Sequence, residues 1–310
     1  MSNNQWIECV PNFSEGRDPA VIERIRRAIV SVGGARLLDQ SADADHHRSV
    51  FSFAGPPDNV AEAVLRAAEA AVELIDLREH RGVHPRIGAL DVVPFIPLDD
   101  STRQQCLDVA LRTGEQLWER LGIPVYLYGD AARIDERRRL ENVRRGQFEG
   151  VRALLPEDAS RRPDIGGPAL HETAGATAVG VRKILIAYNI VLDTPDVAVA
   201  KEIAVRIRES SGGLWAVKAL GLSLASRGLA QVSMNLTDFE VTPPHVAFER
   251  VQQEARRLGA DAIESEIVGL IPRRALDLAA GRDLRLRSFH PEQILENRLA
   301  EARSDMAGEE

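Results

Sequence analysis

A single histidine, His84, stands among residues that restrict the backbone. Gly82 precedes it, Pro85 follows it, and Gly88 and Asp91 come soon after. An apolar run begins directly after this segment, so the histidine is expected in a loop that leads into a strand, where functional side chains are often found. An imidazole with an ordinary pKa of about 6.5 can accept and return a proton near neutral pH. The segment predicts a proton carrier; from spacing alone, a purely structural histidine is an equal alternative.

A metal site is not favoured. His80 and His84 are four residues apart, as in metal-binding helices, but Gly82 lies between them and Pro85 follows. The glutamate that gives the HExxH pattern its chemistry is also missing. Cys9 and Cys106 are far apart and have no ligand-like spacing, so neither a disulfide framework nor a zinc knuckle is expected.

Residues 39–48 carry three carboxylates beside two histidines. They are Asp39, Asp43, Asp45, His46 and His47. A carboxylate here could orient an imidazole or hold a substrate amine. A solvated, aspartate-rich turn between two strands is one alternative. Metal binding by this Asp and His cluster is another, although its spacing matches no recognised ligand pattern.

Two glycine-bearing loops, residues 166–175 and 211–213, would let the backbone approach a planar ligand closely. Neither matches a nucleotide-phosphate motif. A basic cluster between them and the histidine could receive carboxylates, or could be a solvated helix face. Its members are Arg133, Arg137, Arg138, Arg139, Arg144 and Arg145.

The expected elements follow the order β-α-β-β-α-β twice, which is the ferredoxin-like pattern. In the first half we expect strands at 6–10, 36–38, 50–53, 90–96 and 125–128, with helices from Asp18 and over 58–77, 101–121 and 136–145. In the second half we expect strands at 184–191, 217–224, 229–235 and 263–270, with helices entered at Thr194 and at Thr242. Residues 156–180 would cross between the halves or line a ligand.

The chain has 310 residues, 44% hydrophobic and 28% charged, with a net charge of -8. This composition is that of an ordinary globular protein and suits two packed halves. The acidic balance argues against broad nucleic-acid binding. The N-terminus does not resemble a signal peptide and no apolar run could span a bilayer, so we expect a cytoplasmic protein without a membrane partner.

Several long segments together resemble the formiminotransferase domain family, in the stand-alone form without a cyclodeaminase domain. They are ECVPNFSEG (8–16), HRGVHPRIGALDVVPFIP (80–97), PVYLYGDAARID (124–135), GATAVGVRKILIAYNI (175–190), QVSMNLTDFEVT (231–242) and IVGLIP (267–272). The resemblance spans about residues 5 to 280 and is far more specific than any one short motif.

The resemblance implies an α/β (α+β) fold of two ferredoxin-like subdomains whose facing sheets form a substrate tunnel. We expect an N-terminal subdomain over 1–180, a C-terminal subdomain over 181–300 and a frayed tail over 301–310. It also implies a homodimeric transferase of histidine degradation. The formimino group of N-formimino-L-glutamate would pass to N5 of tetrahydrofolate, the co-substrate, to give 5-formiminotetrahydrofolate and glutamate.

In the family, the catalytic histidine corresponds to His84. The residues expected at folate are Gly166, Gly167, Pro168, Ala169, Leu170, His171, Glu172, Thr173, Ala174, Gly175, Gly212, Gly213, Leu214, Lys218, Gly221 and Glu266. N5 would attack the amidine carbon directly, with His84 carrying the proton from N5 to the departing glutamate nitrogen. Candidates for gripping substrate carboxylates are Arg48, Arg86 and Arg182.

Two positions depart from the animal members of the family. Ser41 stands where they have an acidic residue, so Asp39 or Asp45 is our candidate catalytic carboxylate, and Asp43 stays open. Glu266 stands where they have glutamine. Two alternatives therefore remain: transfer of a formyl group from 5-formyltetrahydrofolate to glutamate, and a folate-binding protein without catalysis.

Overall fold

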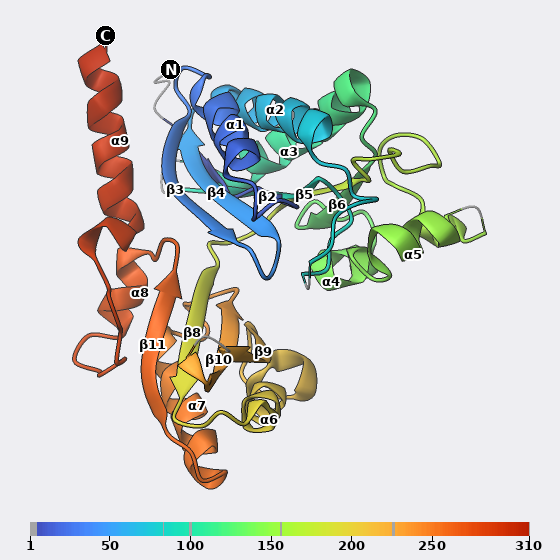
Figure 1. Ribbon diagram of the computed structural model, residues 1–310. Coiled ribbons are helices and arrows are strands. Elements are labelled where there is room, and N and C mark those ends of the chain that lie inside the picture. The colour runs from blue at the N-terminus through green and yellow to red at the C-terminus, as the bar shows by residue number, and fades with distance from the viewer. Residues whose placement is uncertain (1–4, 83, 99–100, 156, 225–226, 310) are drawn as a thin grey trace. The chain divides into compact units, whose positions relative to one another are not determined.

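The structure is a computed structural model that describes residues 5–82, 84–98, 101–155, 157–224 and 227–309. The chain folds as two compact units, Met1–Arg182 and Lys183–Glu310 (Figure 1). Each unit has its own sheet and its own hydrophobic core.

The first unit alternates strands and helices. Its strands are β1 (Ile7–Cys9), β2 (Asn12–Phe13), β3 (Arg36–Asp43), β4 (Arg48–Gly55), β5 (Leu90–Pro97), β6 (Val125–Gly129) and β7 (Thr177–Val181). Its helices are α1 (Pro19–Val30), α2 (Pro57–Leu74), α3 (Arg103–Leu121), α4 (Leu140–Val143) and α5 (Gln147–Leu154).

The strands of the first unit form one mixed sheet. β1 and β2 lie between β4 and β5 and pair antiparallel with both, while β3 pairs antiparallel with the other edge of β4. The elements from β1 to β5 therefore have the predicted ferredoxin-like order. Beyond β5, the sheet continues with β7 and then β6, both parallel to it. The N-terminal ends of β5, β7 and β6 therefore lie side by side at the same end of the strands.

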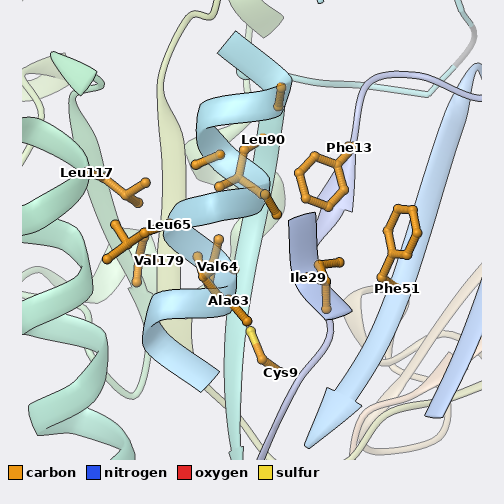
Figure 2. Packing of buried hydrophobic residues seen from close by; sticks show 14 of the residues in the cluster. Cys9, Phe13, Ile29, Phe51, Ala63, Val64, Leu65, Leu90, Leu117 and Val179 are labelled. Carbon is orange, nitrogen blue, oxygen red and sulfur yellow. The ribbon is translucent and has the colours of Figure 1, made fainter. Parts of the chain in front are cut away.

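Helices α1, α2 and α3 cover one face of this sheet (Figure 1). Figure 2 shows how their apolar side chains meet the strands, with Phe13 and Phe51 packed edge to face at 5.5 Å between ring centroids. The opposite face has a smaller cluster, in which Val143 and Val151 from α4 and α5 pack with Tyr126 of β6. Burying one such large apolar side chain fully stabilises the folded state by about 1.5–3 kcal/mol.

Local sequence signals explain where several helices begin. Asp18 caps α1, accepting from the amide of Ala20 at 2.8 Å, and Pro19 is its first residue, as predicted. Thr102 and Gln105 form a capping box at the start of α3, which ends at Gly122 with φ 65°. These caps fix where α1 begins and where α3 begins and ends.

The second unit is a four-stranded antiparallel sheet with helices on one face. Its elements are β8 (Ile186–Leu192), α6 (Val197–Ile207), β9 (Val217–Leu224), β10 (Leu229–Leu236), α7 (Pro244–Arg257), β11 (Ala262–Val268), α8 (Arg273–Leu278) and α9 (Leu295–Glu309). The strand order β11-β8-β10-β9 is again ferredoxin-like. Thus both halves have the predicted architecture.

Four details differ from the sequence predictions. The supposed connection at 156–180 contains β7, a central strand. The helix expected at 136–145 is a 3₁₀ turn (Asp135–Arg138) followed by the short α4. Asp196 caps α6 in place of Thr194. Residues 301–309, expected as a frayed tail, belong to α9, and Glu310 lies outside the described residues.

Among the described residues, no helix is both long enough and apolar enough to cross a bilayer.

Candidate active site

Three loops of the first unit pack tightly around His84. A Cβ atom on Gly82 would lie 2.6 Å from the carbonyl oxygen of His46, and one on Gly16 would lie 2.3 Å from that of Asp43. Both contacts are too short for any side chain, so glycine is required at both positions. The turn between β3 and β4 therefore lies directly against the loop that precedes β5. Val83, next to His84, lies outside the described residues.

His84 accepts a hydrogen bond from Arg48. Nη1 of Arg48 lies 2.8 Å from Nε2 of His84. A guanidinium can only donate, so Nε2 is the unprotonated nitrogen of the ring and Nδ1 carries the proton. Burial, followed by the positive charges of Arg48 and Arg144, lowers the pKa of His84 to about 2. The histidine is thus a neutral imidazole whose basicity is suppressed by its neighbours, which the sequence analysis did not foresee.

A carboxylate and a second imidazole stand next to His84. Oδ2 of Asp43 lies 2.8 Å from Nδ1 of His46, and the backbone amide of His46 donates to Oδ1 of the same carboxylate at 2.8 Å. The His46 ring meets the His84 ring edge-on, with centroids 6.4 Å apart and an angle of 63° between the planes. Asp43 therefore orients an imidazole beside His84.

The other two aspartates of this segment are placed differently. Asp39 lies on β3 opposite Ser52, four residues before Asp43 and about 13 Å away along the strand. Asp45 is exposed in the turn, and its side chain makes no hydrogen bond with the described residues. Of the three carboxylates that the sequence left open, Asp43 has the geometry that favours a role at His84.

Arg144 joins the site from the end of α4. It forms a buried ion pair with Asp91, whose other oxygen accepts from the backbone amide of Ile87 at 2.7 Å. Arg144 was one of six arginines in the predicted basic cluster. Two others, Arg133 and Arg137, bond to the 160–164 segment and are structural.

The guanidinium of Arg86 is bonded to other side chains of the first unit. Arg86 is buried, with 5% of its surface exposed, and its guanidinium bonds to Nδ1 of His80 at 3.0 Å and to Glu149 at 2.7 Å. Because these donors already have partners inside the fold, the geometry does not favour Arg86 as a carboxylate-binding residue.

The same contacts weigh against metal binding by His80 and His84. Nε2 of His80 donates to the carbonyl of His47 at 3.0 Å while Nδ1 accepts from Arg86, so both ring nitrogens are occupied. Within the described ranges, no group of three or more His, Cys, Asp or Glu side chains is placed to hold a metal ion.

Comparison with known proteins identifies the architecture around this site. Residues 6–182 match the formiminotransferase domain, N-terminal subdomain, and residues 187–288 match the formiminotransferase domain. The chain belongs to the formiminotransferase family. The glutamate formimidoyltransferase of Streptococcus pyogenes serotype M1 is 45% identical over 295 residues, which cover 94% of this chain and 98% of that protein.

Other relatives have similar identity. The glutamate formimidoyltransferase of Thermoplasma acidophilum is 43% identical, covering 96% of this chain and 98% of that protein. The formimidoyltransferase-cyclodeaminase of Sus scrofa is 45% identical over 285 residues, covering 89% of this chain and 52% of the longer protein. The formiminotransferase relationship therefore extends over nearly the whole chain.

The first segment expected at folate in this formiminotransferase, residues 166–175, runs along the edge of the sheet where β5, β6 and β7 begin. Its start is exposed and packs on Trp118 of α3, where Cβ atoms on Gly166 and Gly167 would lie 2.8 and 3.2 Å from the indole. Its end is tied to the strand after His84, because the amide of Ala89 donates to the carbonyl of Ala174 at 2.9 Å. The backbone thus links this segment to the His84 loop.

Within 166–175, His171 has a structural task. Its Nδ1 accepts from the amide of Ala174 at 3.1 Å and holds the turn closed. Leu77 donates its amide to the carbonyl of Thr173 at 2.9 Å, and Glu172 pairs with Arg78. The segment's remaining residues, Pro168 and Ala169, are exposed and Leu170 packs against the core.

The second segment, residues 212–221, belongs to the second unit. Gly213 and Gly221 lie against α6, where added Cβ atoms would meet the backbone at 2.4 and 2.1 Å. Gly212 has φ 82°, and Leu214 packs on the core. Lys218 lies on β9 opposite Asn235.

Glu266 lies on β11 opposite Asn189 of β8, which in turn lies opposite Ser233 and then Leu220 across the sheet. Cross-strand partners share a face, so Glu266 and Lys218 are both on the face opposite the core of α6 and α7. Both are exposed.

Arg182 lies at the far end of β5 from His84. Its amide donates to the carbonyl of Phe95 at 3.2 Å, five residues or roughly 17 Å along the strand from Leu90. Its side chain bonds to the buried hydroxyl of Tyr128, whose pKa burial raises to about 12. The adjacent Glu8 is buried too, and desolvation raises its pKa to about 7 against the opposing charge of Arg182.

Sequence reasoning missed the role of two residues here. Arg144 was hidden among neighbouring arginines, and Asp91 was read only as part of the frame around His84. Asp91 is the second residue of the otherwise apolar strand β5, and this was the available signal, since a buried carboxylate needs a charged or amide partner.

Proposed function

We propose that this formiminotransferase transfers the formimino group from N-formimino-L-glutamate to N5 of tetrahydrofolate, giving 5-formiminotetrahydrofolate and L-glutamate. The proposal rests on His84, which accepts a hydrogen bond from Arg48, in a chain that is 45% identical to a glutamate formimidoyltransferase over 94% of its length. The neighbouring arginines suit a donor that carries two carboxylates.

The proposed mechanism needs no covalent enzyme intermediate. N5 attacks the amidine carbon, and Nε2 of His84 takes the proton that N5 loses. The imidazolium then protonates the glutamate nitrogen, and the bond between that nitrogen and the amidine carbon breaks. Nε2 is the right atom because it is the unprotonated one. Holding the two substrates in attack geometry contributes up to about 7–11 kcal/mol in well-oriented systems.

The proposed roles of the surrounding residues follow from their positions. Arg48 is next to Nε2 and would bind a donor carboxylate. Asp43 would keep His46 in place beside the reacting atoms. Arg182, far along β5, suits a carboxylate of the folate tail better than one at the reacting centre. The two segments 166–175 and 212–221, with Glu266, are proposed to contact folate.

The experiment is incubation of the protein with formiminoglutamate and tetrahydrofolate, followed by acid conversion of the product to methenyltetrahydrofolate and measurement of its absorbance. We expect signal from the wild type and a loss of at least about 100-fold in His84→Ala, as for removal of a general acid–base. Folate binding by calorimetry shows that the variant is folded. Turnover within a few-fold of wild type in His84→Ala would remove the histidine from the mechanism.

The same assay with 5-formyltetrahydrofolate and glutamate measures the alternative formyl transfer. A protein that binds folate and turns over neither donor would be a binding protein. The homodimer, the cytoplasmic location and the tunnel between the two sheets stay predictions.

A further inference from the structure

Two guanidinium groups face the imidazole of His84. Arg48 comes from β4 and Arg144 from the end of α4, and both charges act on the ring. Among the described residues, Arg48 forms no ion pair with a carboxylate, and Nε of Arg144 is buried without a hydrogen-bond partner. Each charge also opposes the other, since Arg144 contributes to a lowered pKa of Arg48 after desolvation. Paired guanidiniums with unused donors are suited to a carboxylate.

Asp91 fixes Arg144 relative to His84. One oxygen of Asp91 accepts from the amides of Ile87 and Gly88, at 2.7 and 3.4 Å, and the other receives Arg144. The same buried carboxylate thus holds both the end of the His84 loop and the guanidinium. Such a shared support keeps a binding group in place before its ligand arrives.

Resting on the formimino transfer proposed above, we propose that Arg48 and Arg144 together bind the α-carboxylate of the formimino donor, and that this carboxylate draws Arg48 away from Nε2 of His84. In the donor, the α-carboxylate and the leaving nitrogen are attached to the same carbon atom. A carboxylate held by Arg48 therefore places the leaving nitrogen beside Nε2. The γ-carboxylate is too far along the chain to do this.

Binding of the formimino substrate then frees Nε2 of His84 to act as the base. While Arg48 donates to Nε2, the lone pair that must accept the proton is occupied. A bound carboxylate takes over the Arg48 donors and offsets both positive charges, so the pKa of His84 rises toward its ordinary value. The charged or titratable groups that face the ring are Arg48, Arg144, His46 and His80, with Asp43 behind His46 and Asp91 behind Arg144.

Two analogues of the formimino donor test the roles of its α- and γ-carboxylates separately. N-formimino-isoglutamine has an amide in place of the α-carboxylate, and N-formimino-glutamine has one in place of the γ-carboxylate. We expect kcat/KM for the α-amide to be lower than for the natural donor by on the order of 10- to 100-fold, the effect of losing charged hydrogen bonds. In Arg144→Gln this penalty should shrink to a few-fold, while the KM for tetrahydrofolate stays unchanged. Arg145→Gln, at the exposed neighbouring arginine, is the matched control. Its loss of kcat/KM with the α-amide should equal that of the wild type.

Arg144→Gln leaves Asp91 as a buried charge and could unfold the loop. The double variant Arg144→Gln/Asp91→Asn removes both charges and keeps an amide oxygen for Ile87 and Gly88. It should also lose α-amide discrimination. The inference would be overturned if the folded double variant still preferred the natural donor over the α-amide as strongly as the wild type does. It would also be overturned if the wild type showed no such preference.

A binding measurement distinguishes this inference from the proposed function. In ¹⁵N-histidine-labelled protein, L-glutamate should shift the Nε2 signal of His84 and raise its titration midpoint by at least about one pH unit, whereas γ-aminobutyrate, which lacks the α-carboxylate, should not. If glutamate shifts the signal but no formimino transfer occurs, the proposed function fails and the carboxylate site stands. Transfer activity without a shift or α-amide discrimination means that the carboxylate site is wrong.

Discussion

The ring of His47 stacks on the ring of His80, with centroids 4.2 Å apart and planes 6° apart. His47 belongs to the turn before β4 and His80 to the loop before β5, so the stack joins the two segments that hold Arg48 and His84. Arg86 fixes the His80 ring by donating from Nε to its Nδ1 at 3.0 Å. The distance between the base and its guanidinium therefore depends on residues that do not touch substrate.

Gly82→Ala should lower kcat strongly with little effect on global stability. The new Cβ would lie 2.6 Å from the carbonyl of His46 and 2.7 Å from Cβ of His47, so the His84 loop must move away from the turn. A misplacement on the order of 1 Å can cost about 100-fold in rate. Steady-state kinetics and urea unfolding measure the two effects.

Gly150→Ala is the matched control. Gly150 lies in α5 with nothing within 4 Å of an added Cβ, so alanine should raise the free energy of unfolding by about 0.5–1 kcal/mol and leave kcat unchanged. Equal kinetics in the two alanine variants would show that the loop contact does not position His84.

Arg86→Met should destabilise the first unit by about 2–3 kcal/mol, because it leaves Nδ1 of His80 and nearby carbonyls without their buried donor. Glu149→Gln should cost about 1 kcal/mol or less, because 59% of the Glu149 side chain is exposed. Urea unfolding measures both. A normal stability for Arg86→Met, combined with a raised KM for the formimino donor, would support the sequence interpretation of Arg86 as a substrate-binding residue.

The elements with strong periodic patterns could be predicted from the sequence. Helices α1, α2 and α3 bury one apolar stripe each, and β5 is a buried strand that is apolar apart from Asp91. The missed strand β7 is Thr-Ala-Val-Gly-Val, buried at every position. Its small residues give neither alternation nor bulk, and its place between two parallel strands depends on partners far away in the chain. Periodicity alone cannot reveal such a strand.

The site was predictable where its residues are close in sequence. Gly82, His84 and Pro85 could be read together, but the pairing of Arg48 with His84 joins residues 36 apart. Asp43 was distinguished from Asp39 and Asp45 only by the turn geometry that brings it to His46. The low basicity of His84 also arises from charges on other elements, which a linear pattern does not contain.

Glu8→Gln should make the protein more stable above neutral pH. Burial raises the pKa of Glu8 to about 7 from 4.5, so the folded chain holds this proton more tightly than the unfolded chain. The free energy of unfolding therefore falls as pH rises from 4.5 through 7, by up to about 3 kcal/mol. Glutamine removes this loss, so the variant should exceed the wild type by up to that amount at pH 8 and match it near pH 4.

Urea unfolding at pH 5, 6, 7 and 8 measures the difference for Glu8→Gln. Glu73→Gln, at an exposed glutamate paired with Arg24 on the surface, is the control and should follow the wild-type pH profile. Parallel profiles for Glu8→Gln and wild type would mean that Glu8 titrates normally in the folded chain.

Tetrahydrofolate should change the fluorescence of two of the three tryptophans. Trp118 is 38% exposed and packs on Gly166 and Gly167, and Trp215, inside the segment 212–221, is 71% exposed. Trp6 is buried at 3% and should be silent. Trp118→Phe and Trp215→Phe should each remove part of the quenching, because each indole reports one of the two segments proposed to contact folate. If the double variant, with Trp6 alone, retained the full quenching at unchanged folate affinity, neither segment would be at the folate site.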